Sequence, residues 1–318
     1  EEEILVTNRV RFAALLSAAA ILVAACGSAA TPAPTAAPTP VPSVGATAAP
    51  ATPTPAPTVD PNSLLGKILA AGKIRIATDP NYKPFSYLDD NQQYDGFDVK
   101  TAEEVAKRLG AMYGKDLQVE WVTPSWDAIT AGNWGGRWDI SIGSMSVTAG
   151  RAKVVDFADP YYYDFGGIGI PADSTVTTLD ELAGKKICVG SSTTYEQWLS
   201  GTLEIVDPNM LKPPANADVT PLETDNLCVQ ALKSGRKFDA IAANANGIGD
   251  WIKSGLPVKM LEIGPIFTVS VSFALDKSGP STADIMAPLN QIVADLHSDG
   301  TLSGLSTKYL SRDVTIKP

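Results

Sequence analysis

Short apolar runs alternate with helical patterns from residue 73 onward. Apolar runs at 73–78 and 117–122 are followed by helical patterns at 98–109 and from Trp126, respectively. Strands that alternate with helices form βαβ units, and such units build a mostly parallel sheet. A second alternation occupies residues 165–263. Because 318 residues can form two ordinary domains, we expect an α/β protein with two such units.

Small hydroxyl residues and one arginine follow the apolar strand predicted at 138–143. Ser144, Met145 and Ser146 stand where this strand ends, and Arg151 follows on a short helical turn. We expect all four residues to contact a ligand. Ligands of open α/β sheets bind at the carboxyl ends of the strands. An arginine held there can donate two parallel hydrogen bonds to a carboxylate. Arg151 alone would be read as a solvated helix charge, but its setting favours an anion-binding site.

The same region carries the motif by which the chain can be recognised. Residues 139–162 read D-I-S-I-G-S-M-S-V-T-x-x-R-x-K-V-V-D-F-x-x-P-Y-Y. This motif resembles the extracellular solute-binding proteins of family 3, which serve polar amino acid ABC transporters, and the resemblance extends from about residue 62 to 312. It implies a periplasmic-binding-protein-like fold of type II, with two lobes, two hinge crossings and a ligand cleft between the lobes.

The resemblance also implies how the chain divides. Lobe 1 is expected to comprise residues 62–160 and 273–318, and lobe 2 residues 166–267, with hinges near 161–165 and 268–272. A ligand would lie between the lobes, and hinge closure would bury it.

An amino acid ligand presents a carboxylate, and the resemblance assigns residues to it. From lobe 1 we expect Arg151, the hydroxyl of Ser146 and the backbone near Ser144. Thr193 and Thr194 match family positions at the start of a lobe 2 helix, where free N–H groups attract anions. The alternative for both threonines is ordinary helix capping.

Aromatic and acidic residues are expected around the side chain of the ligand. Tyr82 and Trp126 match family positions that form the walls of this slot, with core packing as the alternative for each. Asp79 stands where some members bind a basic side chain; otherwise it caps the turn before Pro80. Tyr195 flanks the cleft in the same alignment.

An uncharged residue stands where the resembled family has a carboxylate for the ligand ammonium. Asn244 can accept a hydrogen bond but carries no charge, and a buried ammonium without a carboxylate is costly. Either Asp79 or another acid such as Glu196 compensates, or the ligand lacks a free α-ammonium.

The first residues resemble a lipoprotein signal peptide, expected at 1–26. Arg9 and Arg11 precede an apolar run that ends at Cys26, and the run is too short to span a bilayer as a mature helix. The sequence Val-Ala-Ala-Cys at 23–26 matches a lipobox, so Cys26 is the expected lipidation site. Residues 27–61 are mostly Ala, Pro and Thr, which predicts a disordered tether; a proline-rich ligand for a binding module is the alternative.

Composition narrows the remaining function classes. The net charge is −10 and the chain has no basic run, so nucleic acid is excluded as a partner. We expect no cofactor and no metal, since the single histidine, His297, is remote from the cleft motifs. Cys188 and Cys228 both fall in lobe 2 of an exported protein; a disulfide and buried free thiols both remain open.

These observations predict the substrate-binding component of an ABC importer, which captures an amino acid or a related small polar solute and delivers it to a membrane permease. We expect a monomer, located outside the cytoplasm and lipid-anchored to the cell membrane. The first alternative is a sensor domain that presents its ligand to a signalling partner. The second, a dehydratase-like enzyme on the same scaffold, needs a proton donor in the cleft, and Asn244 removes the obvious one. We therefore expect no enzymatic activity.

Overall fold

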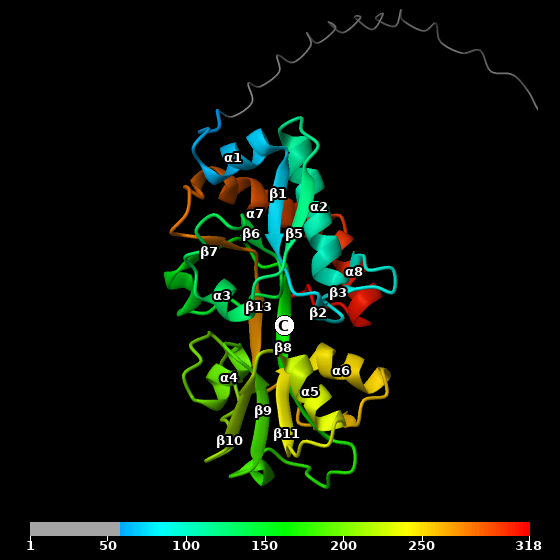
Figure 1. Ribbon diagram of the computed structural model, residues 1–318. Coiled ribbons are helices and arrows are strands. Elements are labelled where there is room, and N and C mark those ends of the chain that lie inside the picture. Colours follow the sequence, from blue (N-terminus) through cyan, green and yellow to red (C-terminus); the bar gives the residue numbers. More distant parts are fainter. Residues whose placement is uncertain (1–57) are drawn as a thin grey trace, which may run out of the picture. The chain divides into compact units, whose positions relative to one another are not determined.

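The computed structural model describes residues 58–318 (Figure 1). The predicted signal peptide, the lipobox at Cys26 and all but the end of the predicted tether lie outside these residues. Val59 packs against the core of the first lobe. Ser63 then caps helix α1 (Leu64–Ala71), because its side chain accepts a hydrogen bond from the backbone amide of Gly66. The structure therefore places the last residues of the predicted tether in the folded part.

The first lobe is built on a mixed five-stranded sheet. In sheet order the strands are β5 (Gln118–Val122), β1 (Lys73–Ala77), β6 (Ile140–Ser141), β14 (Ala274–Asp276) and β7 (Val155–Phe157). Strand β1 pairs in parallel with β5 and β6, whereas β14 pairs antiparallel with β6 and β7. A small separate sheet joins β2 (Asn81–Tyr82), β3 (Ser86–Leu88) and β4 (Tyr94–Asp95).

The helices of this lobe pack their apolar faces against one core. Ile74 and Ile76 of β1 are buried together with Leu109 and Leu289, which come from two different helices. Besides α1, the helical elements are α2 (Phe97–Met112), α3 (Trp126–Thr130), the short 3₁₀ turn η1 (Arg151–Lys153), α7 (Ala283–Ser298) and α8 (Thr301–Leu310).

The second lobe contains a sheet covered on both faces. Its strands follow the order β10 (Asp218–Leu222), β9 (Lys186–Gly190), β11 (Ala240–Asn244), β8 (Tyr162–Pro171) and β12 (Val258–Met260), and β13 (Thr268–Val271) also pairs with β8. Its helical elements are the 3₁₀ turn η2 (Asp180–Leu182), α4 (Thr194–Leu199), α5 (Asp225–Lys233) and α6 (Ala245–Lys253).

Alternation along the strands divides the second lobe into two cores. Ile187 and Val189 of β9 lie in one cluster with Trp198, whereas Cys188 between them lies in another with Trp251. This is the period of two that places successive strand side chains on opposite faces. Cys188 is bonded to Cys228 of α5 by a disulfide, with the Cα atoms 5.7 Å apart.

Two paired strands carry the chain between the lobes. Strand β8 leaves the first lobe and enters the second sheet, and β13 returns beside it in the antiparallel direction (Figure 1). Their register pairs Phe165 with Thr268 and Tyr162 with Val271. Since only these two strands pair along the crossing, side chains on them lie at the junction of the lobes.

Candidate functional site

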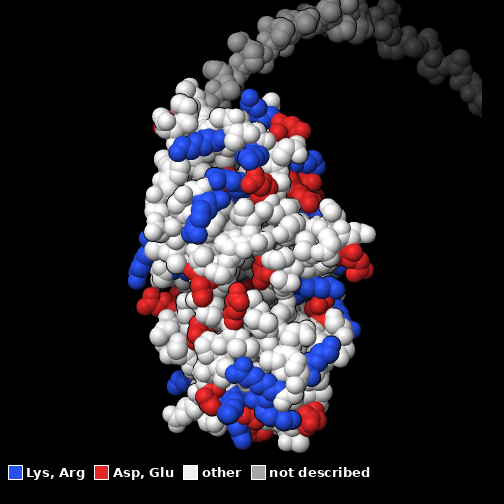
Figure 2. All heavy atoms as spheres, viewed as in Figure 1, with Lys and Arg blue, Asp and Glu red and all other residues white. Residues whose placement is uncertain are grey.

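A cavity of about 1160 Å³ lies between the two lobes. Acidic side chains gather around the hollow that separates the lobes on the face shown in Figure 2. The first lobe lines the cavity with residues that include Thr78, Asp79, Tyr82, Trp126, Ser144, Ser146 and Arg151. From β8 and the second lobe the lining residues include Asp164, Thr193, Thr194, Tyr195, Glu223, Thr224 and Asp225.

Arg151 is a buried cation in the wall of this cavity. Its side chain is anchored at both terminal nitrogens: Nη1 donates to the carbonyl of Ser146 at 3.1 Å, and Nη2 donates to the carbonyl of Ser192 at 2.9 Å. The Nε–H group is buried without a hydrogen-bond partner, and no carboxylate within residues 58–318 lies within 4.0 Å. Burial lowers the pKa of Arg151 to about 10, so the group remains a cation at neutral pH. A buried cation without a counter-ion suits an anionic ligand group.

Trp126 lies against Arg151 at the start of α3. The guanidinium carbon of Arg151 is 5.1 Å from the centre of the indole ring, a cation–π arrangement. The indole Nε1 donates to the carbonyl of Ser192 at 3.2 Å, the same carbonyl that Arg151 uses. Trp126 therefore holds the arginine in place and lines the cavity at the same time.

The strand-end motif, residues 144–146 after β6, is divided between the cavity and the core. Ser144 and Ser146 both line the cavity, although the hydroxyl of Ser144 already donates to Asp98 Oδ2 at 2.6 Å. The prediction of Met145 as a ligand contact requires correction, because its side chain is fully buried in a core cluster with Trp134. With the residues on either side of it directed to the cavity, Met145 points the opposite way.

Helix α4 begins at the cavity with a variant of the capping box, in which Glu196 bonds to the residue before the N-cap. The hydroxyl of Thr193 accepts a hydrogen bond from the backbone amide of Glu196 at 3.2 Å, and the Glu196 carboxylate accepts one from the amide of Ser192 at 2.7 Å. Thr193 and Thr194, both expected near the ligand, line the cavity, and Thr193 also caps α4. Glu196 is thus occupied by the capping box rather than held ready for a ligand ammonium.

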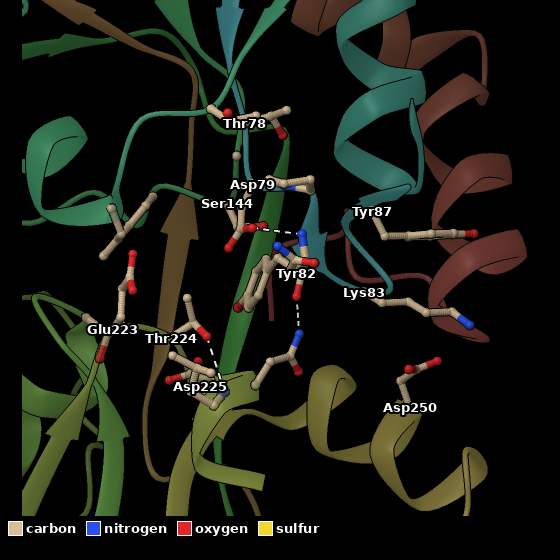
Figure 3. A pocket seen from close by; sticks show the side chains of 18 of the residues that line it. Thr78, Asp79, Tyr82, Lys83, Tyr87, Ser144, Glu223, Thr224, Asp225 and Asp250 are labelled. Atoms are coloured by element: carbon tan, nitrogen blue, oxygen red, sulfur yellow. Dashed lines mark hydrogen bonds between the residues drawn. The ribbon is translucent and has the colours of Figure 1, made fainter. Parts of the chain in front are cut away.

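Tyr82 and Asp79 face the cavity from the loop that follows β1 (Figure 3). The ring of Tyr82 stacks on Phe85 with 5.2 Å between the ring centres, which fixes its orientation. Asp79 accepts a hydrogen bond from the backbone amide of Asn81 at 2.8 Å, so it also caps the local turn. Burial raises the pKa of Asp79, and the nearby charge of Glu223 raises it further.

Asn244 does not line the cavity, and its assignment as a ligand contact requires correction. It is only 1% exposed and ends β11, where its Oδ1 accepts from the amides of Asn246 at 2.7 Å and Gly247 at 3.2 Å. Its Nδ2 donates to Oδ1 of Asp164. Both ends of the amide are therefore used, one to cap α6 and the other to hold an acid.

Asp164 is one of the cavity residues that the sequence did not indicate, together with Thr78, Glu223 and Asp225. It lies on β8, lines the cavity and is 4% exposed. The hydroxyl of Tyr195 donates to its Oδ2 at 2.6 Å. Burial raises the pKa of Asp164 to about 6, although its hydrogen bonds and the charge of Arg151 act in the opposite direction. A charged residue inside an apolar strand was the available signal, because aspartate is rarely buried without a partner.

Further acids face Asp79 from the second lobe (Figure 3). Asp225 begins α5 and accepts a hydrogen bond from the amide of Gly190 at 2.8 Å; burial raises its pKa to about 7. Glu223 lies two residues before it. The hydroxyl of Thr78 is buried in the same cavity wall without a hydrogen-bond partner. The cavity walls therefore combine one buried arginine with several acids.

Neither a metal-binding cluster nor a membrane-spanning helix is found in the described part of the chain. Residues 58–318 contain no group of three or more His, Cys, Asp or Glu side chains that could hold a metal ion. Within the same range, no helix combines the length and the apolar character needed to cross a membrane.

Sequence comparison relates the chain to a family of binding proteins. Residues 74–312 match the model of the bacterial extracellular solute-binding proteins, family 3. The L-cystine-binding protein TcyJ of Escherichia coli (strain K12) is 30% identical over 258 residues, covering 79% of this chain and 88% of that protein. A probable histidine-binding protein of Campylobacter jejuni is 29% identical over 237 residues, covering 74% and 84% of the two chains.

Structure comparison leads to the same group. The ancestral amino acid-binding protein AncCDT-1, a precursor of cyclohexadienyl dehydratase, superposes with a TM-score of 0.65 at 30% identity. The match covers 78% of this chain and 100% of that one. The two-lobed α/β fold predicted from the sequence is thereby confirmed.

Proposed function

Because the chain belongs to family 3 of the bacterial extracellular solute-binding proteins, we propose that it captures an amino acid or a related small polar solute and delivers it to the permease of an ABC importer. The observation that carries this proposal is the buried Arg151 guanidinium, which lines the cavity between the lobes and has an Nε–H group without a hydrogen-bond partner. A ligand carboxylate supplies the counter-ion that the protein does not.

Contacts between the lobes support capture by hinge closure. The carbonyl of Ser192, in the second lobe, accepts hydrogen bonds from Trp126 and Arg151 of the first. On another side of the cavity, the side-chain amide of Asn226 donates to the carbonyl of Asn81. A ligand held between these contacts would stabilise the closed state, and the permease would recognise that state.

The acids at the cavity wall favour a ligand with a positively charged side chain. Glu223 lies close enough to Asp79 to raise its pKa, and Asp79 in turn raises the pKa of Asp225. Like charges placed together in this way are relieved by a cation.

A thermal-shift screen tests the proposal. The purified protein is heated with each of the standard amino acids, and then with opines and small organic acids as carboxylate controls. We expect at least one amino acid to raise the melting temperature, with the affinity then measured by calorimetry. If no amino acid raises it and an unrelated class of solute does, the proposed ligand class is wrong.

We also propose that Cys26 is lipidated and anchors the protein to the cell membrane, outside the cytoplasm. The support is the order of basic, apolar and small residues before it. Cys26→Ser should move the protein from the membrane fraction to the soluble fraction. Continued membrane association of this variant would contradict the anchor.

An enzymatic function is the second candidate, because Asp164 places a carboxyl group with a raised pKa in the cavity. Such a group is suited to proton transfer. Incubation with prephenate or arogenate separates the two functions, and we expect no turnover, because the binding function already accounts for the buried charges. Product formation that is lost in Asp164→Asn would assign the enzymatic function instead.

A further inference from the structure

We infer that Asp164 is the residue that receives the α-ammonium of the ligand. This inference rests on the proposed function, since it assigns one group of the amino acid to one side chain of the cavity. It begins with two opposite charges. Arg151 and Asp164 both line the cavity, and each affects the pKa of the other. Among the described residues, however, they do not form an ion pair within 4.0 Å. A zwitterionic head group carries the two charges that complement this pair.

The carboxylate of Asp164 retains room for a further donor. An ionised carboxylate has about four acceptor positions. Tyr195 donates to Oδ2 and Asn244 donates to Oδ1. These contacts fix the orientation of the carboxylate and leave a position for an ammonium on the cavity side.

Asn244 has a positioning role in this arrangement. In the register of β11 and β8, Asn244 pairs with Gly166, which lies two residues from Asp164 on the same face of β8. Because Oδ1 of Asn244 holds the start of α6, its Nδ2 is directed at Asp164. An asparagine at this position therefore supports a neighbouring charge instead of providing one.

The protein itself does not neutralise Asp164. The other cation near it is Arg312, whose guanidinium lies 4.6 Å from the ring centre of Phe165 and donates to Asn246. Tyr82 and Asp225, which also face Asp164, supply no positive charge. A carboxylate that is 4% exposed and has no cationic partner is costly in the empty protein. A ligand ammonium removes this cost.

The test compares an amino acid with the same molecule lacking its α-ammonium. The probes are L-arginine with 5-guanidinopentanoate, and L-histidine with 3-(imidazol-4-yl)propanoate. Calorimetry on the full chain measures both members of whichever pair binds, in wild type and in Asp164→Asn. We expect this variant to weaken binding of the amino acid by at least about 10-fold, while binding of the des-amino analogue changes by less than about 3-fold. Equal weakening of both probes, or of neither, overturns the inference.

Two further variants keep the test decisive. Asp98→Asn removes a buried acid outside the cavity, so it should change neither probe selectively. Tyr195→Phe removes one hydrogen bond to Asp164 but keeps the charge; if Asp164→Asn does not fold, Tyr195→Phe should still weaken the amino acid more than the analogue. Failure of wild type to bind any amino acid would overturn the proposed function as well, whereas tight wild-type binding without selective loss overturns only the assignment of Asp164.

Discussion

Two buried carboxylates, one in the first lobe and one on the crossing strand, are held in closely similar ways. Asp98 accepts hydrogen bonds from Tyr161 at 2.7 Å and from Ser144 at 2.6 Å. Asp164 accepts one from the hydroxyl of Tyr195 at 2.6 Å and one from Asn244. In each case burial raises the pKa, to about 7 for Asp98 and to about 6 for Asp164.

Asp98 and Asp164 differ in their surroundings. Asp98 lies in the first turn of α2 and ties that helix to the strand-end motif through Ser144, entirely inside the first lobe. Asp164 lies where the lobes meet and lines the cavity with Arg151. A tyrosine hydroxyl and a raised pKa therefore do not distinguish a structural acid from a binding acid. Access to the cavity does.

Removal of the Arg151 charge should have the largest effect on the binding role that distinguishes Asp164 from Asp98. Without Arg151 the cavity keeps Asp164 but loses the charge that receives a ligand carboxylate. Arg151→Ala should weaken binding of the best amino acid from the screen by about 2–5 kcal/mol, measured by calorimetry. Arg236→Ala is the matched control, because Arg236 also stacks on an aromatic ring, at 4.9 Å from Phe238, but does not line the cavity. Unchanged affinity in Arg151→Ala would reject the anion site.

A second carboxylate beside Asp164 would sharpen the comparison. Asn244→Asp replaces a donor by an acid within hydrogen-bonding reach of Asp164. The two acids would then repel each other or share a proton, so the pKa of the pair would rise further. We expect a loss of about 1–3 kcal/mol in the free energy of unfolding at about pH 8, measured in urea.

Measurement of the same Asn244→Asp variant at about pH 5 supplies the internal control, because partial protonation should reduce the loss there. Tighter binding of α-amino acids by this variant would contradict the positioning role of Asn244.

Asp98 should contribute to the pH dependence of the free energy of unfolding. The pKa of Asp98 in the folded protein, about 7, is above the value near 3.9 expected in the unfolded chain. Between these values the folded state binds more protons, so the free energy of unfolding should fall as pH rises from about 4 to about 7, by up to about 1.4 kcal/mol per pH unit. Asp98→Asn removes this contribution. Urea unfolding at several pH values should therefore show a shallower decline in the variant, and parallel curves would contradict the assignment.

The smallest expected effect concerns the charge at the cavity wall. Asp79→Asn keeps an acceptor for the amide of Asn81 but removes the negative charge. We expect binding of L-arginine to weaken by about 2- to 5-fold and binding of L-glutamine to be nearly unchanged. Asp180→Asn, which removes an exposed acid outside the cavity, should affect neither. Equal effects of Asp79→Asn on both ligands would indicate a role in the turn alone.

Much of the fold was predictable, because the relevant signals are local. Alternating strands and helices indicated the α/β class, and the residues after 138–143 indicated the anion site with Arg151. Tyr82 and Trp126 follow strand ends, and both line the cavity. The anion site followed from the rule that ligands collect where parallel strands end, whereas Tyr82 and Trp126 were assigned from the family resemblance.

The acid at the centre of the site depended on long-range pairing. Local sequence was sufficient for the order of the elements, because apolar periodicity reports the secondary structure in which each residue lies. It could not show that Met145 turns into the core, that Asn244 serves a helix start, or that Asp164 reaches the cavity. The pairing of Asn244 with Asp164 follows from the register of β8 with β11, which joins segments about 80 residues apart and sets which side chains share a face.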